Sequence, residues 1–375
     1  YKRQALLLTP YPAVGFALMR RQMRFAEAAV FNSISFTVSA VAALAALMAG
    51  LGVYSLVVSA IVSMLTNTAL IAWRLGWVPG FPSLWAVRPL LGYAGFTAIN
   101  NMIGTSSSRV DNMLVGALLG SAPLGLYNRA YSLARIPSDQ FGESIGPLLL
   151  GSLARIQDDR TASRRLYFRA VAAIATLTWP FLVVLLLIGP AAITWLYGPD
   201  WSGAGTALQA MVVGGFVLVV AQTLRGLLNA QGLVRELVAI NLVTLAGTVA
   251  VVVGLAPFGI AVIAIGISLR EVLVLWMMLR VVRRSRVGIT GWEIVGAVWP
   301  TAVAALAAAS VGGGLLSVVG SEGYLLELLR LVVIGAGVGA AYVLSLIGLR
   351  RAFPAHEGLR SSVDLLEDSL RKALG

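Results

Sequence analysis

The chain has 375 residues, of which 58% are hydrophobic and only 12% are charged, and its net charge is +12. Soluble domains average about 25% charged residues, so this composition excludes an ordinary soluble protein and indicates that lipid covers most of the surface. The chain contains no cysteine, which excludes disulfide bonds and thiolate metal sites.

Apolar runs long enough to cross a bilayer recur from one end of the chain to the other. A spanning helix needs about 20 apolar residues, and helices are expected because backbone polar groups in hydrocarbon must be satisfied within their own segment. We therefore predict an all-α polytopic membrane protein with about eleven transmembrane helices. The predicted segments are 4–19, 29–50, 53–73, 89–117, 122–154, 169–197, 205–230, 235–255, 258–280, 292–318 and 324–348.

Lysine and arginine are concentrated in alternate connections between these segments. The connections "RRQMR" (20–24), "RIQDDRTASRRLYFR" (155–169) and "RVVRRSR" (280–286) are strongly basic, whereas "GSAPLG" (120–125) and "YGPDWSGAG" (197–205) contain neither residue. The positive-inside rule then places the basic connections and the C-terminus on the cytoplasmic side of the membrane. We expect no nucleic-acid partner, because such a partner requires basic residues gathered on one face.

The two ends of the chain carry further information. The sequence begins with Tyr1 rather than methionine, and an odd number of spans places the two ends on opposite sides of the membrane. We therefore expect the natural chain to have further helices before Tyr1. In the tail, 353–375, apolar residues recur every three or four positions and predict a cytoplasmic amphipathic helix, lying either in the membrane interface or against cytoplasmic loops.

Charged residues also occur inside the predicted spans. An arginine or aspartate at the bilayer centre costs at least about 2.5 kcal/mol, so such residues face a protein interior or a water-filled cavity. In the segment 122–154, Arg135, Asp139 and Glu143 are four residues apart and share one helix face. This face is interpreted either as the wall of a hydrated cavity or as a structural network that holds two helices together.

Other spans carry polar groups at comparable depth. Arg225 lies on a polar face of its segment, and Arg270 precedes Glu271 in mid-span as a pair that compensates its own charge. Arg109 and Asp111 form either a local interfacial ion pair or part of the same cavity. Because arginines outnumber carboxylates in these spans, the predicted chamber is cationic and suits an anion such as phosphate, which the planar guanidinium binds at two points.

No enzyme signature competes with this interpretation. The sequence has no ATP-binding phosphate loop and no aspartate-rich metal motif. Its single histidine, His356, lies in the tail, which excludes histidine-based catalysis within the membrane. We expect no catalytic activity and no cofactor or resident metal, apart from a coupling H⁺ or Na⁺.

The stretch 109–150 resembles the signature region of the Wzx-type oligosaccharide flippases, which belong to the multidrug/oligosaccharidyl-lipid/polysaccharide superfamily. The matching positions are Asp111, Gly116, Gly120, Leu124, Gly125, Tyr127, Ala130, Tyr131 and Pro137. A second match has Gly198, Trp201 and Ala204 at its fixed points, and "RRQMRF" (20–25) resembles the family's basic loop. The resemblance covers nearly the whole chain.

The resemblance implies a transporter fold of about fourteen helices in two six-helix lobes with an additional pair. On this mapping, 1–75 is the end of a truncated N-terminal lobe and 88–282 is the complete C-terminal lobe. The additional helix pair is 292–349, and 353–375 is the cytoplasmic tail. The family's first three helices are expected to be absent from this sequence.

The function implied by the resemblance is transport by alternating access. The cargo is an undecaprenyl-diphosphate-linked oligosaccharide for exopolysaccharide, O-antigen or capsule export, and the partners are membrane lipids, a polysaccharide polymerase and glycosyltransferases. Asp139 and Glu143 are our candidates for ion coupling. Our candidates for contact with the diphosphate or the cavity are Arg129, Arg135, Arg225 and Arg109.

Three alternatives stay open at this point. A lipid II flippase shares the fold and the chemistry, while a cation-coupled drug exporter of the same superfamily requires an acid-dominated cavity in the front lobe. A membrane polymerase of lipid-linked repeats requires a sizeable outer loop with arginines, and the outer connections here are short and lack lysine and arginine.

Overall fold

The computed structural model describes residues 10–22, 24–52, 54–75, 95, 102, 109–156, 159–319 and 323–353. Within these ranges the regular structure is entirely helical, which confirms the predicted all-α class. The chain divides into two compact units, Tyr1–Leu91 and Gly92–Gly375. The tail from 354 onward and most of the predicted segment 89–117 lie outside the described residues.

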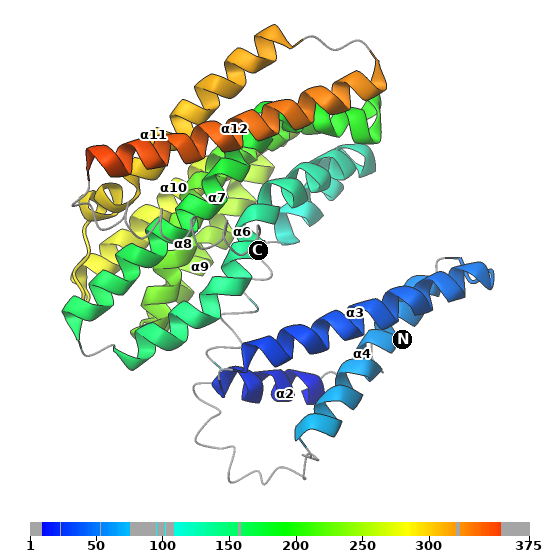
Figure 1. The fold of residues 1–375 in the computed structure, drawn as a ribbon, viewed down its shortest axis with the longest axis horizontal. Helices are drawn as coiled ribbons and strands as arrows, with labels where there is room; N and C mark the ends of the chain where they lie inside the picture. Colours follow the sequence, from blue (N-terminus) through cyan, green and yellow to red (C-terminus); the bar gives the residue numbers. More distant parts are fainter. Residues whose placement is uncertain are drawn as a thin grey trace. The chain divides into compact units, whose positions relative to one another are not determined.

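The first unit is built on a helical hairpin. Helix α3 (Phe25–Met48) and helix α4 (Tyr54–Leu75) pack along each other, and the shorter α2 (Pro10–Arg21) contacts both of them (Figure 1). An ion pair of 3.3 Å between Glu27 Oε2 and Arg74 Nε joins the two long helices. Many other side chains of α3 and α4 are apolar and exposed, as expected for helices that face lipid.

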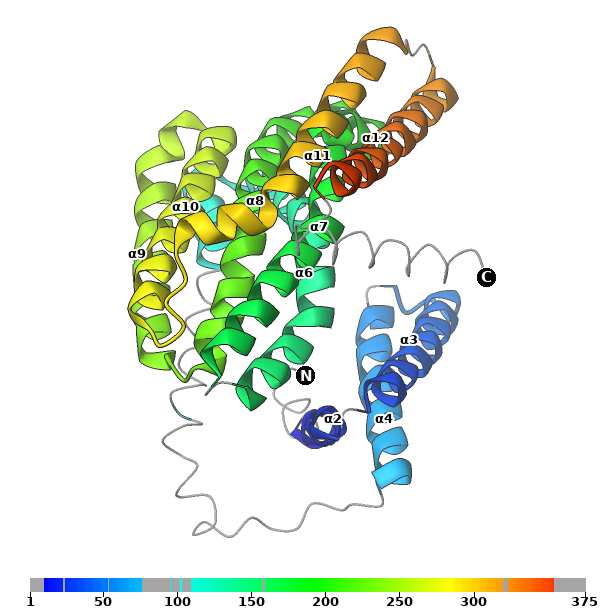
Figure 2. The same cartoon turned by 60° about the vertical axis from the view of Figure 1, so that its left-hand side comes forward.

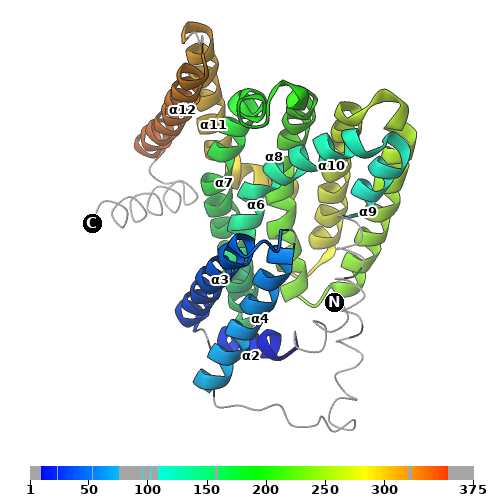
Figure 3. The ribbon, with the colours of Figure 1, turned by 90° about the vertical axis from the view of Figure 1, so that its right-hand side faces the viewer.

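The second unit contains the remaining long helices and holds the main hydrophobic core. Helix α8 is central and packs against α6, α7 and α10, while α9 packs mainly along α10 (Figure 2). The pair α11 and α12 packs on α7 (Figure 3). The helices are α6 (Ser121–Arg155), α7 (Arg160–Tyr197), α8 (Ser202–Ala230), α9 (Val234–Leu255), α10 (Ile260–Arg284), α11 (Gly291–Val318) and α12 (Tyr324–Ala352).

Local sequence signals set where these helices begin. Gly120 separates the helical residues 109–119 from α6 and adopts φ +91°, a left-handed conformation that favours glycine. The Asp159 carboxylate accepts the Ala162 N–H at 2.9 Å and caps the start of α7. Thr290 and Glu293 form a reciprocal capping box at the start of α11.

Helices α8 and α10 approach each other closely at one glycine. A Cβ atom added to Gly214 would lie 3.0 Å from the Cα and 2.9 Å from the Cβ of Ser268. The Ser268 hydroxyl donates a hydrogen bond of 2.7 Å to the Ala210 carbonyl, one turn earlier in α8. This contact fixes the spacing between the two helices beside the cavity described below.

Eight helices in the described part of the chain are long and apolar enough to cross a membrane, which confirms a multi-pass membrane protein. Helix α6 is not among them although it has 35 residues. It carries Arg129, Arg135, Asp139 and Glu143 along its length, so it lacks a continuous apolar stretch. Helix α6 is therefore the least apolar of the long helices, and it carries most of the predicted site residues.

Candidate functional site

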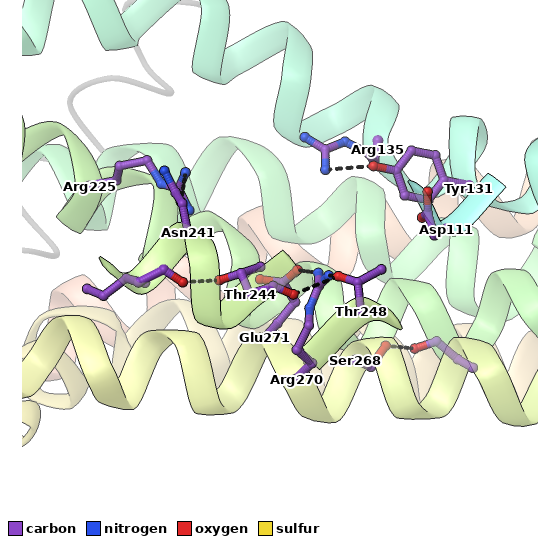
Figure 4. Close-up of polar contacts among 12 residues, drawn as sticks. Asp111, Tyr131, Arg135, Arg225, Asn241, Thr244, Thr248, Ser268, Arg270 and Glu271 are labelled. Atoms are coloured by element: carbon purple, nitrogen blue, oxygen red, sulfur yellow. Dashed lines mark hydrogen bonds and ion pairs between the residues drawn. The ribbon is translucent and has the colours of Figure 1, made fainter. Parts of the chain in front are cut away.

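The second unit encloses a polar cavity of about 290 Å³. The helical segment 109–119 and helices α6, α8, α9 and α10 form its walls, so groups far apart in the sequence meet there (Figure 4). Its polar lining residues are Asp111, Tyr131, Arg135, Gln222, Arg225, Asn241, Thr244, Ser268, Arg270 and Glu271.

Arg135 reaches the cavity from α6, where it is held by residues one turn away on either side. Its Nη2 and Nε atoms bond to the Oδ1 and Oδ2 atoms of Asp139 at 3.0 and 3.3 Å. Its Nη1 atom donates to the Tyr131 hydroxyl at 3.1 Å. The spacing of four residues places these three side chains on one helix face. The hydrogen bonds to Asp139 and Tyr131 hold the charged guanidinium of Arg135 in one orientation.

Asp111 forms a second polar group at the cavity and is almost fully buried, with 3% of its surface exposed. Its Oδ2 atom accepts a hydrogen bond of 3.1 Å from the Tyr127 hydroxyl, and its Oδ1 atom accepts the Asn112 backbone N–H at 2.7 Å. Tyr127 itself is completely buried. The alternative of a local ion pair with Arg109 is wrong, because no such pair forms among the described residues and Arg109 is exposed.

Arg225 connects α8 to α9 across the cavity. Its Nη1 atom donates a hydrogen bond of 3.1 Å to the Asn241 Oδ1 atom. The Arg225 Nε atom is buried and has no hydrogen-bond partner among the described residues. A buried N–H group without an acceptor costs free energy, so an acceptor from a ligand would be favoured at this position.

Arg270 on α10 supplies the third cavity arginine. It bonds to the Thr248 hydroxyl and forms an ion pair with its neighbour Glu271, as the sequence predicted for this pair. Its Nε atom is also buried without a hydrogen-bond partner among the described residues. The cavity therefore combines three arginines with two carboxylates, and two of the three guanidinium groups retain an unsatisfied donor.

The predicted site residues fall into three groups in the structure. Arg135 and Arg225 line the cavity, and Asp139 lies just behind Arg135 as its ion-pair partner. Arg109 and Arg129 are exposed and do not line it. The guanidinium carbon of Arg129 instead lies 4.9 Å from the centre of the Tyr197 ring.

The side chain of Glu143 lies outside the described residues, although its backbone belongs to α6.

The contribution of α9 to the cavity was not predicted from the sequence. Asn241, Thr244 and Thr248 are three and four residues apart, so they share the helix face that meets Arg225 and Arg270. That spacing is visible in the sequence, but the three residues are uncharged and lie within an apolar run. The described residues contain no cluster of three or more His, Cys, Asp or Glu side chains that could hold a metal ion.

A family model described as "Polysaccharide biosynthesis protein" matches residues 4–206, which is more than half of the chain. The chain belongs to this family. The prediction that it is related to the Wzx-type polysaccharide flippases is thereby confirmed. The matched range contains Asp111 and Arg135, whereas Arg225, Asn241 and Arg270 lie beyond it.

Curated relatives of this family are polysaccharide biosynthesis proteins from several bacteria. The lipopolysaccharide biosynthesis protein WzxC of Escherichia coli (strain K12) is 23% identical over 234 residues, covering 60% of this chain and 47% of the relative. The succinoglycan biosynthesis transport protein ExoT of Rhizobium meliloti (strain 1021) is 24% identical over 227 residues, covering 58% and 44%. The teichuronic acid biosynthesis protein TuaB of Bacillus subtilis (strain 168) is 22% identical over 161 residues, covering 43% and 33%.

The chain thus spans a third to a half of the length of these relatives. Among solved structures, the lipid II flippase MurJ in its inward closed conformation is similar with a TM-score of 0.62. The match covers 86% of this chain and 68% of that chain at 12% sequence identity. This likeness shows the fold, which agrees with the predicted all-α polytopic class.

Proposed function

We propose that this chain is part of a flippase that moves an undecaprenyl-diphosphate-linked oligosaccharide across the bacterial inner membrane. The observation that carries the proposal is the cationic cavity, in which Arg225 and Arg270 each keep a buried N–H without an acceptor. Phosphate oxygens are strong acceptors whose geometry matches the guanidinium fork. The names of the relatives, which refer to lipopolysaccharide, teichuronic acid and succinoglycan, support a polysaccharide precursor as the cargo.

In this proposal, the cavity holds the diphosphate while the sugar and the lipid occupy different surroundings. Arg225, positioned by Asn241, donates to one phosphate, and Arg270 donates from the opposite wall. The oligosaccharide occupies the hydrated space, and the prenyl chain stays in the bilayer because transferring it to water is unfavourable. Rocking of the lobes then exposes the site to the two leaflets in turn, as in other transporters with a site near the midplane.

Ion coupling fits the contact between Arg135 and Asp139. As long as Asp139 is ionised, its carboxylate occupies two N–H groups of Arg135. Protonation of Asp139, or Na⁺ binding to it, would release the guanidinium for the phosphate, so ion and cargo occupancy would be linked. Asp139 and Glu143 remain our coupling candidates, and Arg109 and Arg129 remain candidates for cargo contacts outside the cavity.

The proposed setting follows from the distribution of charge. The basic connections and the C-terminus face the cytoplasm, where the lipid-linked repeat is assembled by glycosyltransferases, and a polymerase receives it on the other side. The chain performs no catalysis in this scheme. A second candidate function is the transport of lipid II, which the likeness to the MurJ fold favours.

Complementation in the native host tests the proposal. The gene in its natural full length, and its Arg225→Ala and Arg135→Ala variants, are introduced into a strain that lacks it. We expect both variants to lose surface polysaccharide and to accumulate lipid-linked repeats inside the membrane at normal protein level. Arg155→Ala, a change of an exposed arginine at the end of α6, is the matched control and should export normally.

The outcomes separate the two candidate functions. Normal export in both cavity variants would contradict the assignment of the cavity as the cargo site. Accumulation of lipid II, with lysis and unchanged surface polysaccharide, would favour the cell-wall precursor as the cargo. In either case the lipid-linked species is identified by mass spectrometry of the extracted membrane.

A further inference from the structure

A second, larger cavity lies on the other side of α8. It is a groove of about 1000 Å³ bounded by α7, α8, α10 and the start of α11. Its floor contains Trp179 and Phe216, whose rings meet edge to face with centroids 5.4 Å apart. Its rim includes Trp276 and Trp292, and Trp292 is 83% exposed. The groove is therefore apolar inside and open along one side.

The charges of the groove are all of one sign. Arg280 and Arg283 line it, and no lining residue is acidic. The guanidinium carbon of Arg280 lies 3.6 Å from the centre of the Trp276 ring, a cation–π contact that holds the arginine at the rim. Neither arginine forms an ion pair with a described residue. Two positive charges thus border an apolar groove whose own lining contains no acidic residue, whereas Glu236 lies with Arg280 at a separate, smaller cavity.

The nearest acidic residue along α11 is already engaged elsewhere. Glu293 forms an ion pair with Arg164 of α7 and accepts the Thr290 backbone N–H at 2.9 Å. Arg164 also donates hydrogen bonds of 2.9 Å to the carbonyls of Val287 and Gly288. These contacts join the connection between α10 and α11 to α7, and they engage Glu293 away from the groove arginines.

The groove lies at helix ends, where lipid headgroups are found. Its arginines belong to the last turns of α10, and Thr290 precedes the first residue of α11. Tryptophan and arginine are the residues that concentrate at the membrane interface, and basic pockets between helix ends bind anionic headgroups. A ligand here would place a negative group at the arginines and a hydrocarbon chain along the aromatic floor.

We propose that this groove is a binding site for an anionic glycerophospholipid of the membrane. The phosphate lies between Arg280 and Arg283, and an acyl chain runs along Trp276 toward Phe216. The groove shares no lining residue with the cargo cavity, because the two face opposite sides of α8. Its occupant is thus separate from a lipid whose phosphate is held by Arg225. The proposal does not depend on the cargo or on transport.

Quenching of tryptophan fluorescence by brominated lipid tests the site. The full-length protein is reconstituted into phosphatidylcholine vesicles that contain increasing fractions of dibrominated phosphatidylglycerol or dibrominated phosphatidylcholine. The signal of Trp276 is obtained by subtracting the Trp276→Phe variant, since the chain has nine tryptophans. We expect half-maximal quenching at a mole fraction about 25-fold lower for the anionic lipid, because each of the two basic side chains near an anionic headgroup contributes about fivefold.

The double variant Arg280→Gln/Arg283→Gln should remove this preference, so that both brominated lipids quench alike. The control is Arg350→Gln/Arg351→Gln, which removes the same charge at the end of α12, outside the groove, and should keep the preference. Equal quenching by both lipids in the wild type, or an equal loss in the control, would overturn the proposal. If equimolar undecaprenyl phosphate protected Trp276 from quenching, the groove would instead be assigned to a prenyl chain. If a higher protein-to-lipid ratio protected Trp276, the groove would be assigned to a second copy of this chain.

Discussion

The replacement of Arg225 by glutamine should weaken the binding of a prenyl diphosphate by about ten- to a hundredfold. In the structure, one N–H of Arg225 is bonded to Asn241 and the buried Nε–H has no acceptor among the described residues. A hydrogen bond to a charged group contributes about 1.5–3 kcal/mol, and each 1.4 kcal/mol corresponds to about tenfold in affinity. Loss of a single such bond to phosphate therefore gives the stated range.

The measurement is a titration of undecaprenyl diphosphate into nanodiscs that contain the full-length protein, with binding followed by calorimetry. Arg225→Lys should fall between the wild type and Arg225→Gln, because it keeps the charge but loses the planar fork. Arg155→Gln, at an exposed position outside the cavity, should bind as the wild type does. Wild-type affinity in a folded Arg225→Gln protein, or an equal loss in Arg155→Gln, would refute the assignment of Arg225 as a phosphate donor.

Three further changes probe the packing and the coupling of the site. Gly214→Ala should destabilise the second unit by about 1–3 kcal/mol in thermal unfolding, since the new methyl group would overlap Ser268. Tyr127→Phe should cost about 1–3 kcal/mol in the same assay, because it removes a hydrogen bond from the buried Asp111. Asp139→Asn should bind the cargo at least as tightly as the wild type, because the Arg135 guanidinium is released, but it should make transport in vesicles independent of a proton or sodium gradient.

The two stability changes have matched controls. Gly313→Ala in α11 should not destabilise the protein, because nothing lies within 4 Å of its added methyl group and alanine favours a helix. Tyr54→Phe removes a hydroxyl from a tyrosine that is 69% exposed and should leave unfolding unchanged. Equal destabilisation in a control would contradict the packing argument, and retained gradient dependence in Asp139→Asn would exclude that residue from coupling.

The helices could be predicted from the sequence because apolar runs of spanning length are unambiguous, but their ends could not. The predicted segment 169–197 lies inside α7, which begins nine residues earlier, at Arg160. Hydropathy detects only the part of a helix that lies in hydrocarbon, whereas the helix continues through a basic stretch outside it. The start is set instead by the Asp159 cap, a local hydrogen bond that an apolar pattern does not report.

The charged residues of the candidate site could be predicted from the sequence. Arg135 and Arg225 are conspicuous in apolar segments, and both line the cavity. The hydroxyl of Thr244 is inconspicuous because threonine can satisfy itself within a helix, here with a hydrogen bond of 2.7 Å to the Ile240 carbonyl. Spacing along one helix also cannot tell which faces meet, so Arg129 was grouped with Arg135 although it turns toward Tyr197 instead.

The hydrogen bonds that each cavity arginine already makes within the protein predict how much that arginine contributes to ligand binding. On α6, Arg135 is already satisfied by Asp139 and Tyr131 of the same helix. On α8 and α10, Arg225 and Arg270 each retain a buried N–H that no described residue accepts. A ligand gains most from donors that are not already satisfied, since it then replaces no existing bond. The phosphate should therefore bind toward α8 and α10, and Arg225→Gln should weaken binding more than Arg135→Gln does. The reverse order in the same titration would mean that Asp139 already releases Arg135 in the resting protein.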